Sequence, residues 1–124
     1  MEDNMPNQEI IENYFDAIHM GGWESYVADD IVFMNSSLDK VALGKAAYLE
    51  AAGRFFKLTT AVEIRQMLIE NEKAAVIARY RVRSPKGSAG VCDVAEFLTV
   101  KKEKLVSSVI FFDTKALAEF MAQK

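Results

Sequence analysis

The first half of the chain places its apolar side chains three and four residues apart, which is the period of an α-helix. The clearest run ends at Gly21 and Gly22, and glycines favour the end of a helix. This half predicts four elements in order: a long amphipathic helix over 7–20, a short helix over 23–28, a brief strand over 31–35 and a second long helix over 45–57.

From Thr59 onward the period changes to two, as expected for strands with one buried face. A short last helix follows, which Asp113 or Thr114 can cap. Because helices come first and long antiparallel strands follow, we expect an α+β fold with helices packed on the concave face of a curved, mostly antiparallel sheet. Four long strands are predicted, with a turn at 84–87 between the second and the third: 59–69, 76–83, 90–101 and 105–112.

Length and composition limit the class of protein. A chain of 124 residues has the size of one domain, so we expect a single domain over 1–124 with residues 1–6 flexible. The longest apolar runs, such as 109–112, are far shorter than the ~20 residues that span a bilayer. Residues 1–8 lack the basic and apolar regions of a secretory signal. We therefore expect a cytoplasmic protein that does not enter a membrane.

Charge and the rarer residue types exclude further classes. The net charge is -3 and no long basic tract is present, so we expect no nucleic-acid partner. One cysteine, Cys92, and one histidine are too few for an internal disulfide or a Cys/His metal cluster. We expect no metal and no cofactor.

Three stretches, "YFDAIHMGGWESYVADDIVFMNS", "TAVEIRQ" and "KLVSSVIFFDTKAL", together with the order of elements, resemble the nuclear-transport-factor-2-like superfamily. The similarity is greatest to its SnoaL-like and ketosteroid-isomerase-like branches. It covers nearly the whole chain and rests on a helix ending in glycines, on "ADD" before a strand, and on an aromatic-aromatic-Asp finish to the last strand. The resemblance implies a cone-shaped, cystatin-like α+β barrel with a deep apolar pocket between sheet and helices. It also implies a homodimer formed through the outer sheet face.

The resemblance further implies where catalytic groups of relatives would fall. Tyr14 falls where ketosteroid isomerases place the tyrosine that stabilises an oxyanion. Their base, an aspartate, falls at Asn35, which cannot take up a proton, and their second oxyanion donor, a neutral carboxylic acid, falls at Ala95. The aspartate that activates water in limonene epoxide hydrolases falls at Ile110. Neither catalytic set is therefore retained.

Asp93 is the predicted carboxylate of the pocket. If Ala95, Phe97 and Thr99 lie on the concave face of their strand, period two places Asp93 there as well. An inward carboxylate can act as a general base, with Tyr14 and Asn35 stabilising developing negative charge. An apolar lining with a few polar groups suits a small-molecule site. The side chains expected to line it are Tyr14, Asn35, Val62, Tyr80, Asp93, Phe97, Ile110 and Phe112.

Each polar candidate also has a purely structural interpretation. Tyr14 can be a core residue whose hydroxyl is satisfied, and Asn35 can hydrogen-bond the Ser-Ser turn that follows it. Asp93 can be solvated or paired with an arginine. The outer sheet face is expected to mix charged and apolar side chains and to pair with itself about a twofold axis. Its expected members are Glu63, Arg65, Arg79, Arg81, Arg83 and Glu96, with Met67, Ile69, Val94 and Leu98 among them.

Three functions remain open from the sequence. The first is a protein that binds a small, largely hydrophobic molecule, oriented by Tyr14, Asn35 and Asp93. The second is a cofactor-independent isomerase, cyclase or hydrolase with Asp93 as its base, and the third is a dimerisation or scaffold module whose pocket is filled. A cavity of roughly 300 Å³ between the first helix and the sheet would argue against the third. Asn35 favours binding, because an amide both donates and accepts hydrogen bonds.

Overall fold

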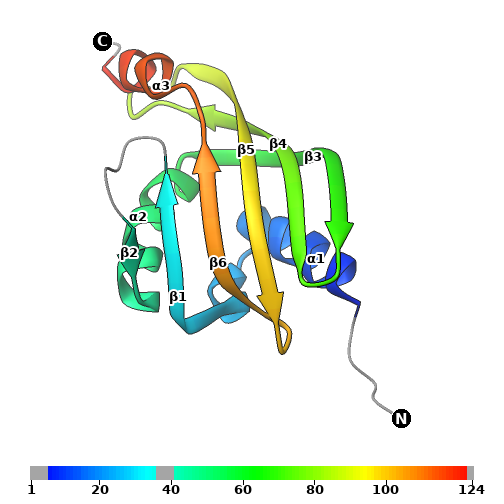
Figure 1. Ribbon diagram of the computed structural model, residues 1–124. Coiled ribbons are helices and arrows are strands. Elements are labelled where there is room, and N and C mark those ends of the chain that lie inside the picture. Colours follow the sequence, from blue (N-terminus) through cyan, green and yellow to red (C-terminus); the bar gives the residue numbers. More distant parts are fainter. Residues whose placement is uncertain (1–5, 36–40, 123–124) are drawn as a thin grey trace.

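The computed structural model describes residues 6–35 and 41–122 (Figure 1). Its elements are α1 (Asn7–Met20), the 3₁₀ helix η1 (Trp23–Tyr26), β1 (Val27–Asn35), β2 (Ala42–Leu43), α2 (Lys45–Phe56), β3 (Thr59–Glu70), β4 (Lys73–Arg83), β5 (Ala89–Lys101), β6 (Lys104–Phe111) and α3 (Thr114–Met121). The predicted helices and long strands are confirmed in their order. Two differences are that β1 begins at Val27 and that β2 was not predicted. The expectation for residues 1–6 falls outside the described residues, apart from Pro6.

The six strands of the described residues form one sheet in the order β2-β1-β6-β5-β4-β3. β1 and β6 run parallel, and the other neighbouring strands are antiparallel. β2 and β3 are the two edges, so the curved sheet does not close on itself. The expected α+β fold with a curved, mostly antiparallel sheet is confirmed.

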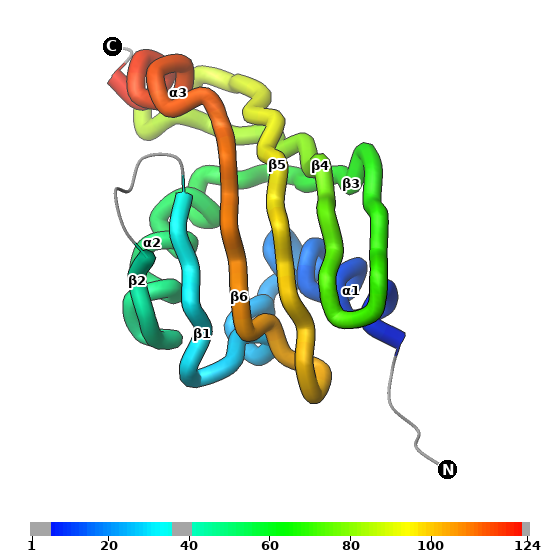
Figure 2. Tube along the Cα trace, viewed as in Figure 1, coloured from blue at the N-terminus to red at the C-terminus, as the bar shows by residue number. Residues whose placement is uncertain are grey.

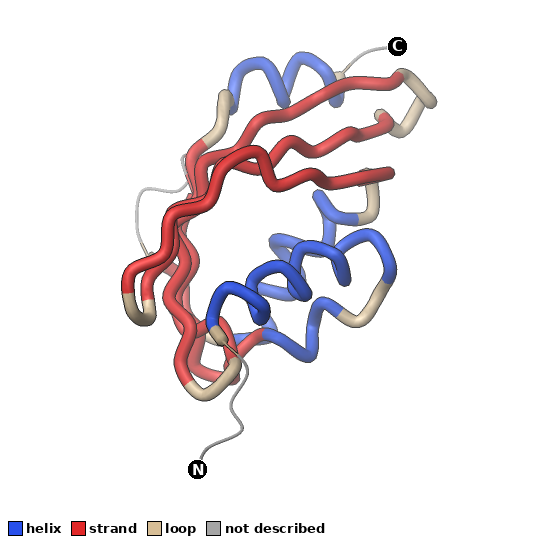
Figure 3. The backbone as a smooth tube through the Cα atoms, turned by 90° about the vertical axis from the view of Figure 1, so that its right-hand side faces the viewer, coloured by secondary structure: helices blue, strands red, loops and turns tan. Residues whose placement is uncertain are grey.

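The helices cover the sheet unevenly. Figure 3 shows α1 and α2 on the concave side of the sheet, where α1 lies against β3 and α2 against β1. The short helix α3 lies at the end of the sheet where β5 begins (Figure 2). In the described part of the chain, no helix is both long and apolar enough to cross a membrane.

Helix α1 supplies much of the core. Its buried face carries Ile10, Ile11, Tyr14, Phe15, Ala17 and Ile18. The helix ends where the glycines predicted, because Gly21 has a φ of 103° and its N–H donates to the Ala17 carbonyl at 2.7 Å. Only glycine adopts such a backbone conformation without strain.

The side of β5 that faces the core is the opposite of the one predicted. Buried and outward side chains alternate along this strand, as they do where one face of a sheet is covered. The buried set is Val94, Glu96, Leu98 and Val100, and the outward set is Asp93, Ala95, Phe97 and Thr99. The predictions that Asp93, Ala95, Phe97 and Thr99 face inward, and that Val94, Glu96 and Leu98 face outward, are therefore wrong.

The register between β4 and β5 explains the reversal. Val76 and Tyr80 are buried residues of β4, and they lie opposite Glu96 and Cys92 of β5. Residues that face each other across a ladder point to the same side of the sheet. The even-numbered residues of β5 must therefore enter the core together with those of β4.

Candidate functional site

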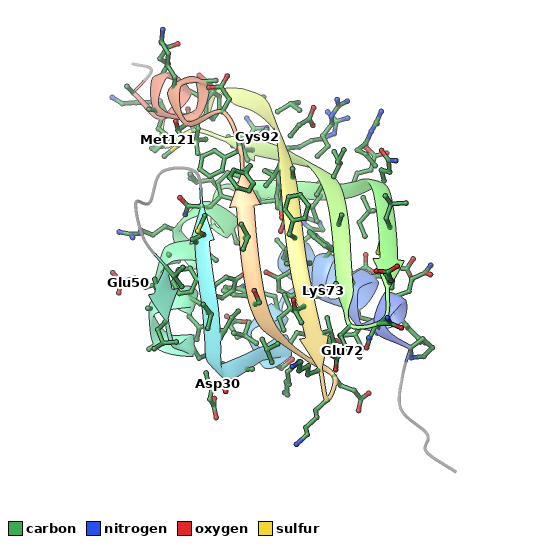
Figure 4. All side chains as sticks on the ribbon, viewed as in Figure 1. Asp30, Glu50, Glu72, Lys73, Cys92 and Met121 are labelled. Carbon is green, nitrogen blue, oxygen red and sulfur yellow. The ribbon has the colours of Figure 1, made fainter. Side chains whose placement is uncertain are left out.

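A hollow of about 280 Å³ lies between α2, α3 and the facing parts of β1, β4, β5 and β6. Most of its lining is apolar or aromatic, with polar side chains from Asn35, Tyr48, Arg54, Tyr80 and Cys92. Figure 4 labels two lining residues, Cys92 on β5 and Met121 on α3, at the same end of the molecule. The hollow adjoins the second long helix, whereas we expected one beside the first, whose apolar face is fully packed.

Aromatic rings form one wall of the hollow. Phe56 stacks on Tyr80 with ring centroids 6.2 Å apart and an interplanar angle of 10°. Phe55 meets the same tyrosine edge-on at 5.1 Å. These contacts fix the Tyr80 ring between α2 and the sheet, and they leave flat aromatic surface beside the hollow.

Glu96 is the carboxyl group that the core encloses. It extends from the buried face of β5, is 1% exposed, and accepts a 2.6 Å hydrogen bond from the Tyr80 hydroxyl. Burial raises the pKa of Glu96 from 4.5 to about 7, because the charged form loses its hydration, and the bond from Tyr80 opposes only part of this shift. Near neutral pH this carboxyl can therefore hold or release a proton.

Tyr80 connects this carboxyl to the hollow. The Tyr80 side chain lines the hollow, whereas Glu96 does not. The Tyr80 hydroxyl donates its hydrogen bond to the Glu96 carboxyl. Burial and the neighbouring Glu96 raise the pKa of Tyr80 well above its usual value. The phenol therefore stays protonated and remains a hydrogen-bond donor.

A second buried pair, formed by two hydroxyls, lies beside the Glu96–Tyr80 pair. The Tyr14 and Tyr48 hydroxyls, from α1 and α2, are 2.7 Å apart, and both residues are almost fully buried. Burial raises the pKa of Tyr48 to about 12 and that of Tyr14 well above its usual value. Tyr48 also lines the hollow, so Tyr14 stands one hydrogen bond behind it. The interpretation of Tyr14 as a core residue with a satisfied hydroxyl agrees with this geometry.

Ser108 on β6 adjoins the tyrosine pair. It is fully buried, and its hydroxyl has no hydrogen-bond partner of normal geometry among the described residues. It nevertheless lies close enough to the Tyr48 hydroxyl to lower the pKa of that group.

Asp93, the predicted base, lies on the outer face of the sheet. Its carboxylate accepts two hydrogen bonds from the Arg79 guanidinium, at 2.8 and 3.1 Å. This arginine lowers the pKa of Asp93 below its usual value. The side chain is about half exposed and does not line the hollow. The alternative of pairing with an arginine is the one that the structure bears out.

The other predicted lining residues divide into two groups. Asn35, Tyr80, Ile110 and Phe112 do line the hollow. Val62 lies instead along a groove between α1 and β3, and Phe97 is 49% exposed on the outer face. The Ser-Ser turn after Asn35 lies outside the described residues.

Sequence reasoning missed Glu96 and Tyr48. Glu96 was expected on the outer face, because period two places it opposite to Ala95 and Phe97, which were expected to face inward. Tyr48 is absent from the residues expected to line the pocket. The signal for it was present in the sequence, since a buried tyrosine usually hydrogen-bonds another polar group.

Cys92 and the acidic side chains complete the chemistry of the site. Cys92 is half-buried in the wall of the hollow, and burial raises the pKa of its thiol, which favours the protonated form. No group of three or more His, Cys, Asp or Glu side chains within residues 6–35 and 41–122 is placed to hold a metal ion. The described groups can thus exclude water, contact an apolar body, and exchange one proton through Tyr80 and Glu96.

Solved structures share this fold over most of the chain. A proposed SnoaL-like polyketide cyclase from Jannaschia sp. CCS1 is 16% identical, covers 100% of both chains and has a TM-score of 0.80. TerC, co-crystallised with polyporic acid, is 19% identical over 96% of this chain and 100% of its own, with a TM-score of 0.77. A proposed ketosteroid isomerase from Kribbella flavida DSM 17836 is 15% identical over 86% of this chain and 77% of its own, with a TM-score of 0.70.

Identities this low establish the fold alone, and a fold can host many activities. A search of curated proteins found no match. Residues 9–108 match the family described as the SnoaL-like domain, which is most of the chain. The chain therefore belongs to the SnoaL-like domain family of the nuclear-transport-factor-2-like superfamily that its sequence resembles.

Proposed function

We propose that the chain binds a small, largely hydrophobic molecule in the hollow between α2, α3 and the sheet. The observation that carries the proposal is the lining, which is mostly apolar and aromatic with few polar groups, around about 280 Å³. Small-molecule sites have this composition, and their volumes begin near 300 Å³. The co-crystallisation of TerC with polyporic acid supports a ligand site in this fold. A scaffold with a filled interior is disfavoured by the same hollow.

Filling the hollow tests the proposal. Cys92→Trp places a large ring inside it, whereas Val91→Trp places the same ring on the outer face, where Val91 is 54% exposed. We expect the neutral fluorescent probe N-phenyl-1-naphthylamine to bind the wild type and Val91→Trp, and to lose most of its affinity for Cys92→Trp. Circular dichroism checks that both variants fold. Equal binding by the two variants would contradict the proposed site.

Native mass spectrometry of freshly purified protein gives the chemical class of the ligand. A retained molecule should be present in the wild type and in Val91→Trp and be absent from Cys92→Trp. Retention in all three forms would place the bound molecule elsewhere.

A second candidate function is acid–base catalysis without a cofactor, with Glu96 in place of Asp93. The buried Glu96–Tyr80 pair favours it, because a general acid or base works best with a pKa near the operating pH. In one step, the Tyr80 hydroxyl takes a proton from the substrate as it passes its own to the ionised Glu96 carboxylate.

Two conservative substitutions test the second candidate. On a panel of ketones, lactones and epoxides, we expect any turnover to fall at least about 100-fold in Glu96→Gln, which is typical for loss of a general acid or base. Asp93→Asn should retain it, because Asp93 lies on the other face of β5. Turnover that survives Glu96→Gln would exclude this mechanism.

A further inference from the structure

Arg54 is the charged side chain that lines the hollow. It lies in the last turn of α2 and is exposed to solvent, so it marks the side where the hollow meets water. The ion pairs found among the described residues, Arg65 with Glu63 and Arg79 with Asp93, do not include it. No aspartate or glutamate is among the lining residues of the described chain. Among the described residues, the hollow is therefore lined by one cation and by no carboxylate.

The polar groups farther inside are already satisfied by one another. The Tyr80 hydroxyl donates to Glu96, and the Tyr48 hydroxyl bonds that of Tyr14. The Cys92 thiol is held in its neutral form by burial. A ligand gains little by placing a charge at this inner end, because an ion without a partner is costly in an apolar site.

Given the proposed binding function, on which this inference rests, we propose that the hollow selects a hydrophobic monoanion. The apolar body of the ligand lies against Phe55, Phe56 and Tyr80, and its acidic oxygen group remains at the solvent side beside Arg54. A guanidinium has a planar fork of N–H donors that matches a carboxylate, and the charge of the pair makes these bonds stronger than neutral ones. The side-chain amide of Asn35 lines the same hollow and can contact the same group.

Arg54 also has a role that needs no ligand. A cation in the last turn of a helix interacts favourably with the helix dipole, and Arg54 is the basic residue in the last turn of α2. If this were the whole role of Arg54, its removal would lower the stability of the fold and would change the affinities for charged and neutral ligands to the same extent. The two roles can therefore be separated by comparing ligands of one shape and different charge.

Isothermal titration calorimetry at about pH 8, where a carboxylic acid is ionised, provides the comparison. The probes are 2-naphthoate and 2-naphthamide, which share a two-ring body and differ in charge. We expect the wild type to bind naphthoate about fivefold more tightly than naphthamide, as for a partly exposed ion pair. In Arg54→Gln the preference should disappear through weaker naphthoate binding alone, and Arg54→Lys should retain part of it.

Arg81→Gln is the matched control, because Arg81 is exposed on β4 and does not line the hollow. It should leave both affinities at their wild-type values. Equal wild-type affinities for the two probes, or an equal loss of both in Arg54→Gln, would overturn the selection of an anion while preserving the proposed binding site. Failure of both probes and of N-phenyl-1-naphthylamine to bind would overturn the binding function together with this inference.

Discussion

At the scale of single residues, Glu96 makes the stability of the fold depend on pH. Its pKa is 4.5 when unperturbed and about 7 in the folded chain. Between these values the folded chain holds a proton that the unfolded chain has released, so the free energy of unfolding falls as pH rises. The stabilisation of the fold by this bound proton is complete below pH 4.5 and is lost once the pH passes about 7. We predict that Glu96→Gln removes this dependence.

Urea unfolding between about pH 5 and pH 8 measures the effect. Relative to Glu96→Gln, the free energy of unfolding of the wild type should fall by up to roughly 3 kcal/mol over this range. The slope is about 1.4 kcal/mol for each pH unit between the two pKa values. Glutamine keeps an oxygen that can accept the bond from Tyr80. Glu63→Gln, an exposed change on β3, should keep the wild-type slope. Parallel pH curves for the wild type and Glu96→Gln would refute the buried titration.

The two tyrosines of the second pair should respond unequally to loss of a hydroxyl. In Tyr14→Phe, the Tyr48 hydroxyl can turn to Ser108, which already influences its pKa. In Tyr48→Phe, the buried Tyr14 hydroxyl loses the hydrogen-bond partner found for it among the described residues. An unsatisfied buried hydroxyl costs about 1–3 kcal/mol. We therefore predict that Tyr48→Phe is the more destabilising change.

Thermal or urea unfolding of both single variants and of the double variant checks this order. The double variant should lose less stability than the sum of the single ones, because it leaves no hydroxyl of the pair unsatisfied. Tyr26→Phe, a half-buried position outside the pair, serves as the control. Equal effects of the two single changes would show that Ser108 does not substitute as a partner.

At the scale of elements, periodicity identified the helices and long strands, but one turn length decided which residues enter the core. A four-residue turn over 84–87 would pair Arg83 with Ser88, and the inward residues of β4 would then lie opposite Ala95 and Phe97. The observed connection is one residue longer and pairs Arg83 with Ala89. A register shift of one residue reverses every side chain of a strand.

The sequence of β5 could not reveal this shift. Both of its faces carry apolar side chains, with Val94 and Leu98 on one and Ala95 and Phe97 on the other. Local hydrophobicity therefore does not distinguish the two faces. Because Glu96 lies on the face of Val94 and Leu98, its charge wrongly indicates that this face is exposed. Four of the predicted lining residues nevertheless line the hollow, because their strands have one clearly apolar face or end at the site.

The packing of α3 should depend on the absence of a side chain at residue 90. A Cβ on Gly90 would lie 2.6 Å from Cε1 of Phe120, and α3 buries no residue that would hold it against this clash. The Asp113 carboxylate caps the helix by accepting from the Ala116 N–H at 2.9 Å, so α3 can move as an intact unit. We predict that Gly90→Ala displaces α3 and opens the hollow.

The reaction of Cys92 with a maleimide reports this opening, because Cys92 and the α3 residues Leu117 and Met121 line the same hollow. The labelling rate should rise several-fold in Gly90→Ala, while the midpoint of global unfolding changes little. Gly90→Ala combined with Phe120→Leu removes the clash and should restore the slow rate. An unchanged rate in the single variant would show that the Phe120 ring moves aside without displacing the helix.

At the scale of the whole molecule, the outer sheet face is more apolar than the sequence predicted. Its exposed side chains include Ile77 (43%), Phe97 (49%) and Phe111 (45%). The Phe97 and Phe111 rings meet edge-on with centroids 6.2 Å apart. On the same face, Arg79 of β4 and Asp93 of β5 form an ion pair. An apolar centre beside charged groups is the composition of a protein interface.

We predict that this face joins two copies of the chain in a symmetric dimer. About a twofold axis the same patch meets itself, so Phe97 would be buried twice, and Phe97→Glu would place two like charges together in an apolar interface. Sedimentation velocity at tens of micromolar should give a dimer for the wild type. Phe97→Glu should raise the dissociation constant by about 30-fold, equivalent to roughly 2 kcal/mol. Leu43→Glu, on the far edge strand β2, should leave the dimer intact. A monomeric wild type, or an equal effect of both substitutions, would exclude this interface.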